Sequence, residues 1–174
     1  MNEMCKEIIE RRSCKSYLTD PVPEELINEV VQAGLYAASG LNRQPAEILV
    51  ITNKEIRDKF SKLNAKYDPK KRVDPYYDAP VILCVFAKKD EPMGIYDGSL
   101  ALGNMMLAAK SLGLGSCWIH RAKEVLNDPE GKEILKSIGL TDEYEGVGNL
   151  ALGYAKIMPE NELPRREGRV HYIK

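Results

Sequence analysis

The chain has 174 residues, enough to bury one sizeable core and too few for two comfortable domains, so we expect a single domain over residues 1–174. Apolar residues make up 44% and charged residues 29%, proportions that indicate a globular protein rather than a disordered one. The 25 basic and 26 acidic residues leave a formal net charge of -1. This balance excludes a global attraction to nucleic acid or to a membrane, so any basic site must be local.

The N-terminal sequence and the cysteines indicate a soluble, cytoplasmic protein. The first twelve residues are charged almost from the start and lack the apolar region of a signal peptide. The longest uncharged apolar stretch, 98–109, is too short to span a bilayer. The four cysteines are scattered, without a CxxC pair, and no metal site is expected. Cys84 and Cys117 lie within apolar runs and are expected to be buried.

In the first half of the chain, apolar periodicity and capping signals predict three helices and one strand. The helices are expected over 3–11, from Pro23 to about 37, and from 52 to about 64, with a loop over 39–45 and a strand over 48–51. Pro23 suits the first position of its helix. Thr52, followed three residues later by Glu55, is expected to open the third helix with a capping box.

The second half begins with a polar stretch, 65–78, which contains two prolines and is interpreted as a loop or lid. Strands are expected over 80–87, 114–119 and 147–155, helices over 96–112, 121–126 and 128–138, and an extended tail over 156–174. Apolar residues circle the 96–112 helix entirely, so it should be buried all round, in a core or between subunits. This mixture of elements predicts an α+β fold with three layers.

The first candidate for chemistry is a basic cluster formed by Arg11, Arg12, Ser13 and Lys15. Three cations and a hydroxyl within five residues can surround one dianion, because guanidinium groups match the geometry of a phosphate. The same cations could instead form a solvated helix end, where they interact favourably with the C-terminal helix dipole. The cluster by itself leaves both interpretations open.

The second candidate is the loop that contains Ser39, Asn42 and Gln44. Amide side chains both donate and accept hydrogen bonds, so they can recognise the edge of a heteroaromatic ring. A plain turn, in which Asn and Gly serve for their backbone tolerance, is the alternative interpretation.

The third candidate is the glycine-rich segment 113–120, with the residues Gly115, Trp118, Ile119 and His120. Its glycines allow a ligand to approach the backbone. Trp118 either offers a flat apolar surface to such a ligand or is simply a residue of the hydrophobic core. The segment is not a dinucleotide fingerprint, because Trp118 stands where the third glycine is required and a strand follows.

The fourth candidate is the pair Arg165 and Arg166 in the tail. These arginines alternate with acidic residues, a pattern that is also typical of a solvated segment. A nucleophilic Cys117–His120 pair is disfavoured, because this spacing on a strand end points the two side chains to opposite faces. We therefore expect no catalytic side chain of the usual nucleophilic kind.

These four segments, in this order and at this spacing, resemble the FMN-dependent nitroreductase family from about residue 10 to residue 172. RRSCKSY is similar to the family's phosphate-binding signature, and SGLNRQP to its loop before the first strand. DGSLALGNMMLAAKSLGLGSCWI is similar to its central helix, turn and strand, and NLALGYAKIMPENELPRR to its closing strand and tail. The resemblance implies an α-β-α sandwich around a mainly antiparallel sheet, and a homodimer with FMN at the interface.

The resemblance also implies roles for individual residues. The positions that bind the phosphate, the ribityl chain and part of the ring correspond to Arg11, Arg12, Ser13 and Lys15. The loop that approaches the flavin, in most members from the partner subunit, corresponds to Ser39, Asn42 and Gln44. The strand end beside the cofactor corresponds to Gly115, Trp118, Ile119 and His120. A basic position that completes the phosphate grip corresponds to Arg165 or Arg166.

By this resemblance, NADH or NADPH reduces FMN and leaves, and a nitroaromatic, quinone or related acceptor is then reduced in a ping-pong reaction. The flavin supplies the redox chemistry, which explains why no catalytic dyad is needed. Two departures keep an alternative open, namely a flavin-binding protein for storage, sensing or electron relay without a dedicated organic substrate. Ala46 and Glu47 replace an aromatic residue that usually follows the Gln-Pro pair, and 64–77 leaves little room for the covering helical excursion of larger members.

Overall fold

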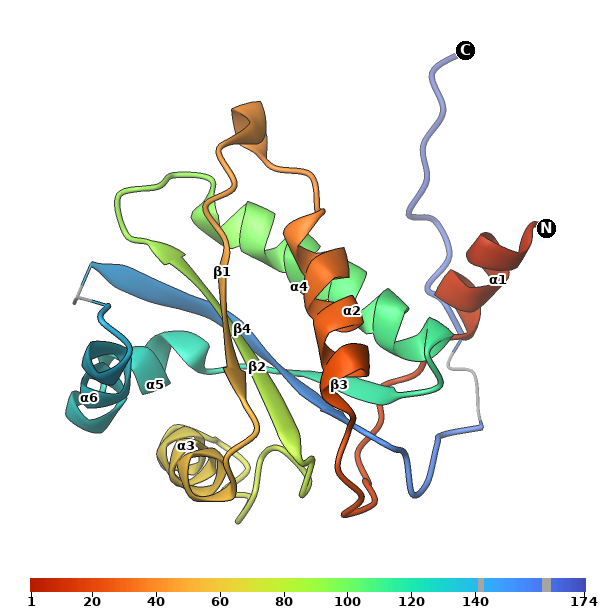
Figure 1. The fold of residues 1–174 in the computed structure, drawn as a ribbon. Helices are drawn as coiled ribbons and strands as arrows, with labels where there is room; N and C mark the ends of the chain where they lie inside the picture. The colour runs from red at the N-terminus through yellow and green to blue at the C-terminus, as the bar shows by residue number, and fades with distance from the viewer. Residues whose placement is uncertain (141–142, 161–163) are drawn as a thin grey trace.

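The computed structural model describes residues 1–140, 143–160 and 164–174. Within these residues a four-stranded sheet lies between two layers of helices (Figure 1). Its strands are β1 (Glu47–Ile51), β2 (Val81–Lys88), β3 (Gly115–Ile119) and β4 (Tyr144–Gly153). They are ordered β1-β2-β4-β3, and each neighbouring pair is antiparallel. The predicted α+β sandwich with a mainly antiparallel sheet is therefore confirmed.

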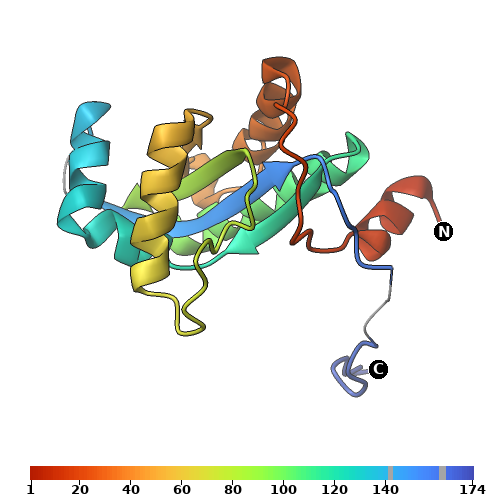
Figure 2. The same ribbon diagram turned by 90° about the horizontal axis from the view of Figure 1, so that it is seen from below.

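The helices divide between the two faces of the sheet (Figures 1 and 2). One face is covered by α2 (Glu24–Leu35) and α4 (Gly94–Ser111), and the other by α3 (Lys54–Lys66), α5 (Ala122–Asn127) and α6 (Pro129–Ser137). The short helix α1 (Glu3–Glu10) lies beside the end of α4, where Glu7 pairs with Lys110 at 2.9 Å. In the described part of the chain, no helix is long and apolar enough to cross a membrane.

Strand β2 occupies the interior of the sheet because its side chains can be buried on both faces. Val81 through Ala87 are all buried, as the continuous apolar run predicts. Leu83 and Val85 enter the core under α2 and α4, whereas Ile82 and Cys84 enter the core under α3, α5 and α6. The predicted burial of Cys84 and of Cys117 is confirmed.

Several predicted boundaries are corrected. Asn53, not Thr52, caps α3, because its side-chain oxygen accepts the backbone N–H of Ile56 at 3.1 Å. Pro23 is the N-cap of α2 rather than its first helical residue, and β4 begins at Tyr144 instead of 147. The tail has no helix or strand over 156–160 and 164–174, as expected, and residues 161–163 lie outside the described residues.

Helix α4 is not buried all round within one chain. Its inner side packs on the sheet through residues such as Leu102 and Met105, but Leu100 is 52% exposed, and Ile95 and Tyr96 are also exposed. A helix that is apolar on every side is normally buried all round, but within the described part of one chain α4 is covered only where it meets the sheet, α2 and α1. Burial of the outer side between subunits stays a prediction.

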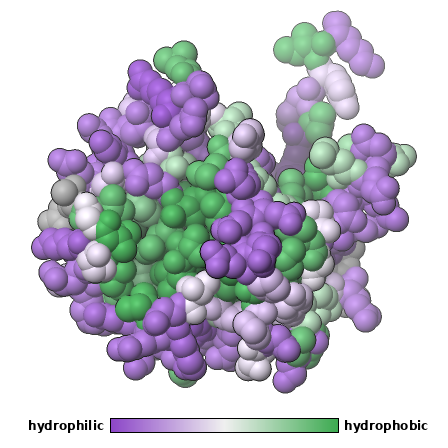
Figure 3. Space-filling model, viewed as in Figure 1, coloured by the Kyte–Doolittle hydropathy of each residue, from purple (hydrophilic) through white to green (hydrophobic). Residues whose placement is uncertain are grey.

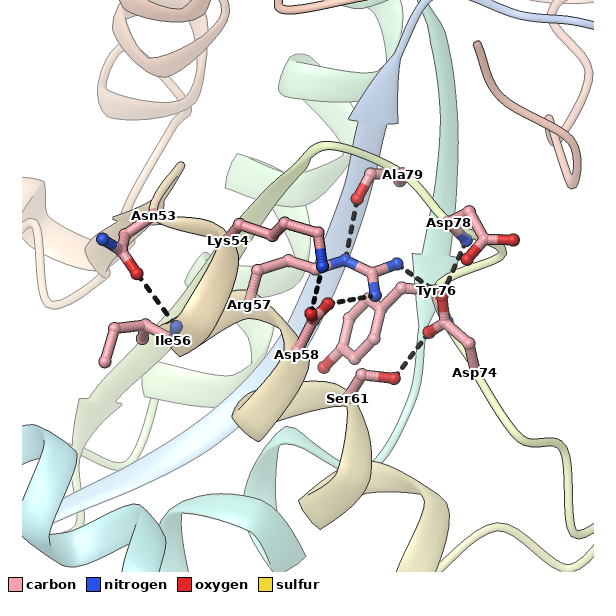
Figure 4. Close-up of polar contacts among 10 residues, drawn as sticks. All are labelled: Asn53, Lys54, Ile56, Arg57, Asp58, Ser61, Asp74, Tyr76, Asp78 and Ala79. Atoms are coloured by element: carbon pink, nitrogen blue, oxygen red, sulfur yellow. Dashed lines mark hydrogen bonds and ion pairs between the residues drawn. The ribbon is translucent and has the colours of Figure 1, made fainter. Parts of the chain in front are cut away.

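The stretch 65–78 is interpreted from the sequence as a loop or lid, but its first two residues belong to α3. The chain from 67 to 80 is a loop that Arg57 ties to α3 (Figure 4). Arg57 is 8% exposed and donates through Nε to the carbonyl of Ala79 at 3.0 Å. Its other nitrogens donate to the carboxylates of Asp58 and Asp74. Burial raises the pKa of Asp74, but hydrogen bonds from Ser61 and Arg57 outweigh it and hold that pKa below its ordinary value.

A second ion pair fixes the middle of the same loop. The buried carboxylate of Asp68 accepts from Nε of Arg72 at 2.6 Å and from Nη2 at 2.8 Å, and these bonds lower its pKa to about 2. The Arg72 guanidinium also lies 5.7 Å from the centre of the Tyr77 ring. The two clusters hold the loop at several points along its length.

Replacing Arg57 with methionine is expected to lower the free energy of unfolding by about 3–5 kcal/mol, because Asp74 loses its buried cation. The matched control is Lys54→Met, since the Lys54–Asp58 pair is exposed to solvent; it should cost less than about 1 kcal/mol. Urea denaturation followed by circular dichroism measures both variants. Equal losses would contradict a loop anchored through Arg57.

Candidate functional site

The predicted phosphate-binding segment runs along the outer edge of β3. Ser13 forms a parallel bridge with Ser116, and the backbone N–H of Cys14 donates to the carbonyl of Ser116 at 2.9 Å. Further on, the N–H of Leu18 donates to the carbonyl of Tyr154. The structure thus brings the first and third predicted segments together, although about a hundred residues of chain separate them.

Gly115 is required for this contact. A Cβ atom at Gly115 would lie 2.9 Å from both Cβ and Sγ of Cys14, closer than real side-chain atoms approach one another. Cys14 is completely buried in the space that the glycine leaves. In this structure Gly115 serves the packing of the basic segment against β3.

Three members of the basic cluster influence the thiol of Cys117 electrostatically. Burial raises the pKa of Cys117, while a hydrogen bond with Ser13 and the positive charges of Lys15 and Arg11 oppose that rise. Nη1 of Arg11 is buried and has no hydrogen-bond partner among the described residues. A buried guanidinium nitrogen without an acceptor is costly, and an anionic or hydroxyl-rich ligand at this place would relieve that cost. The donor set therefore fits a phosphate ester such as FMN.

Arg12 has a different local role. Its Nη1 donates to the carbonyl of Ile9 at 2.7 Å and to that of Arg11 at 3.0 Å, at the C-terminal end of α1. The helix-end interpretation of the cluster thus describes this nitrogen of Arg12, whereas Arg11 presents a nitrogen that the described residues leave unsatisfied.

The end of β3 divides between core and surface. Trp118 is half-buried against the core under α4, and a Cβ at Gly148 would lie 2.8 Å from its ring, so it serves largely as a core residue. Ile119 is buried in the opposite core. His120 is exposed where the strand ends.

The loop around η1 (Gly40–Asn42) has a constrained backbone. Leu41, Asn42 and Gln44 have φ angles of 52°, 55° and 50°, in the left-handed region that favours glycine. Gln44 donates through its backbone N–H to Oγ of Ser39 and through Nε2 to Oδ1 of Asn42, each at 3.1 Å. The side chains of Ser39 and Asn42 therefore both accept hydrogen bonds from Gln44, one from its backbone and one from its side chain.

A buried carboxylate holds this loop against α4. Asp97 is buried in the first turn of α4, and both of its oxygens accept the backbone N–H of Gly40, at 3.3 and 3.2 Å. Asp97, Ser39 and Gln44 border a cavity of about 170 Å³ between α2 and α4.

One chain does not bring all four predicted segments together. The loop with η1 projects beyond one end of α2, away from α1 and the basic cluster (Figures 1 and 2). Arg165 and Arg166 are exposed on the tail, which leaves the body on the side of α1. Their role in the phosphate grip stays a prediction.

Three buried polar residues near these segments were not predicted as site residues, namely Asn64, Asp97 and Asn149. A carboxylate in the first turn of an apolar helix, as at Asp97, is a recognisable signal. An amide within an apolar strand, as at Asn149, is another. Asn64 carries no comparable signal in its neighbourhood.

Comparisons with known proteins agree with this geometry. Residues 8–154 match the family model described as Nitroreductase family. A relative from Methanothermobacter thermautotrophicus is 33% identical over 124 residues, which cover 67% of this chain and only 60% of that protein. The FMN reductase [NAD(P)H] of Bacillus subtilis is 29% identical over 177 residues, 88% of this chain and 66% of that protein.

A solved structure is similar over its whole length. The crystal structure of a nitroreductase with bound FMN from Bacteroides fragilis superposes with a TM-score of 0.88 at 28% identity, covering 100% of both chains. The family model spans most of the present chain and includes the first three predicted segments, whereas Arg165 and Arg166 lie beyond its end. This protein therefore belongs to the nitroreductase family.

Proposed function

We propose that this protein is an NAD(P)H-dependent oxidoreductase that binds FMN through residues 11–15 and reduces a nitroaromatic, quinone or related acceptor. The observation that carries the proposal is the buried Nη1 of Arg11, which has no acceptor among the described residues. It lies in a segment whose Ser13 forms a bridge with Ser116 of β3 and whose Lys15 acts electrostatically on Cys117 of the same strand. The relatives named for FMN reduction with NAD(P)H, and the similar nitroreductase with bound FMN, support this assignment.

The residues of this chain bind and orient the cofactor. Arg11 and Lys15 offset the charge of the phosphate, and the hydroxyl of Ser13 offers a further hydrogen bond. The bound FMN supplies the hydride and electron transfer, so the protein needs only to hold the ring and leave one face accessible. Reductant and acceptor would use that face in turn, which is the structural basis of a ping-pong reaction.

We also propose a homodimer, because the surface of one chain leaves a large apolar face uncovered. The outer edge of β1 has no strand partner among the described residues. A groove of about 430 Å³ runs along it, lined by residues that include Leu35, Val50 and Ile138. Figure 3 shows this apolar face over β1, beside α2. An open, apolar sheet edge favours association, so a second copy is the occupant we propose.

Further apolar side chains are exposed on α1, on α4 and in the tail. They are Met4, Ile8, Ile9, Ile95, Tyr96, Leu100, Val170, Tyr172 and Ile173. Contact with a second copy would bury the outer side of α4. It would also allow the Ser39–Gln44 loop of one subunit to approach the basic cluster of the other. The cytoplasmic location expected from the sequence stays a prediction.

Purified protein should be yellow and should release FMN on denaturation, and NADH or NADPH should bleach the bound flavin in an anaerobic stopped-flow experiment. Protein that is colourless and also ignores added FMN would refute the proposal. Bound flavin that neither nucleotide reduces would favour the storage, sensing or electron-relay alternative.

Arg11→Ala should weaken FMN binding by about 1.5–3 kcal/mol, roughly 10- to 150-fold in Kd, the scale of a hydrogen bond to a charged group. Lys6→Ala is the matched control, because Lys6 is an exposed cation on the preceding helix α1 and its pair with Glu10, at 3.9 Å, is also exposed. Fluorescence titration of the apoprotein with FMN measures both. An unchanged Kd for Arg11→Ala would remove this residue from the site.

Light scattering should give wild-type protein the mass of two 19.5 kDa chains. Val50→Lys should yield a monomer with weakened FMN binding, because Val50 lies in the apolar groove and is already 40% exposed, so the single chain tolerates a lysine. Lys62→Glu, an exposed change on α3, is the control and should leave the dimer intact. A wild-type monomer that binds FMN fully would contradict the proposed interface.

A further inference from the structure

Two buried amide side chains hold consecutive peptide carbonyls at the end of β3. Asn64 on α3 is 1% exposed, and its Nδ2 donates to the carbonyl of His120 at 2.8 Å. Asn149 on β4 is 0% exposed, and its Nδ2 donates to the carbonyl of Ile119 at 3.4 Å. Side chains from two different elements therefore fix the backbone just where β3 ends.

The residue that follows has a strained backbone. Arg121 has φ 81° and ψ 13°, a left-handed conformation that costs free energy in a residue with a side chain. Such a conformation persists only where neighbouring contacts hold it. On one side Asn64 binds the preceding carbonyl. On the other side, the carbonyl of Arg121 accepts the N–H of Val125 at 2.9 Å, and its guanidinium pairs with Glu124 at 2.8 Å.

The direction of these carbonyls sets the direction of two N–H groups. Each peptide here is trans and planar, so its N–H points opposite to its C=O. The N–H groups of His120 and Arg121 consequently point away from the two buried amides. Neither donates to a backbone carbonyl among the described residues. Both remain available to a ligand beside the strand end, where the His120 side chain is also exposed.

Stability alone does not account for Asn149. Its Oδ1 is buried and lacks a hydrogen-bond partner within the described part of the chain. An unsatisfied buried acceptor destabilises the folded state, and leucine, which has a similar size, would avoid that cost in this apolar sheet. The hydrogen bond from Nδ2 of Asn149 to the carbonyl of Ile119 therefore explains best why an amide occupies this position.

Asn64 connects the same place to the anchored loop. Its Nδ2 also donates to the hydroxyl of Tyr76 at 3.2 Å, and Tyr76 is fully buried in the loop that Arg57 and Asp74 tie to α3. The peptide between His120 and Arg121 is thus held by the hydrogen bond from Asn64, and Asn64 itself lies beside the buried Tyr76 of the ion-paired loop. A peptide held in this way can present its N–H groups without rearranging when a ligand binds.

We propose that Asn64 and Asn149 are positioning residues, which hold the peptides from Ile119 to Arg121 so that two backbone N–H donors face the bound flavin. The proposal rests on the proposed function, because the end of β3 is the strand end expected beside FMN. It adds two residues to that site that act through the backbone and do not touch the cofactor.

The test compares FMN-loaded Asn149→Leu, Asn64→Ala and Tyr76→Phe with the wild-type protein. Asn149→Leu should keep or raise the midpoint of urea unfolding, because it removes an unsatisfied acceptor. The same variant should shift the visible circular dichroism and the reduction potential of the flavin, and should lower kcat/KM for NAD(P)H by about tenfold or more. Asn64→Ala should change the flavin in the same way.

Tyr76→Phe is the matched control, since it removes the bond between Tyr76 and Asn64 and leaves the bond to His120. It should lower stability without altering the flavin spectrum, the potential or kcat/KM. If Asn149→Leu has wild-type flavin properties, the proposal is wrong, and this variant decides the matter even if Asn64→Ala fails to fold. A wild-type protein that binds no FMN would overturn the proposed function instead, so the two failures are distinguishable.

Discussion

The contact between the segment after α1 and the outer edge of β3 is the constraint on which the site depends. Cys14 is buried against Gly115, and Tyr17, which bridges to Ala155, donates its hydroxyl to the carbonyl of Cys14 at 3.0 Å. These contacts cover a sheet edge that would otherwise expose unpaired backbone groups. They also place the basic cluster against β3. The same contacts therefore cover this edge of the sheet and form the candidate anion-binding surface.

The two edges of the sheet differ in what covers them. The edge at β3 is covered by the chain's own N-terminal segment, whereas the edge at β1 borders an apolar groove. None of the described elements covers that groove, because α2 to α6 pack on the two faces of the sheet and α1 lies beside the end of α4. The asymmetry gives a physical reason for association and for a site to which two copies contribute.

Backbone strain near the site coincides with buried polar side chains. The left-handed residues around Asn42 follow Gly40, whose N–H is bound by Asp97, and left-handed Arg121 follows His120, whose carbonyl is bound by Asn64. In each case a side chain from a helix on one face of the sheet fixes a loop backbone. Such strain persists only where the surroundings over-determine the conformation, and it is common at binding sites.

Local pattern determined much of this protein from the sequence alone. The apolar run of β2 predicted a strand buried on both faces, and four short segments in order predicted the family, because both signals lie in neighbouring residues. Tertiary structure decided what depends on distant atoms. It left Nη1 of Arg11 without an acceptor among the described residues, whereas Nη1 of Arg12 binds the carbonyl of Ile9. It also left one side of α4 exposed, and it brought Asn64 into hydrogen-bond contact with His120, 56 residues away in the sequence. Periodicity reports which side of an element is apolar, but only the order of the strands decides which polar groups meet, and that order is a property of the whole chain.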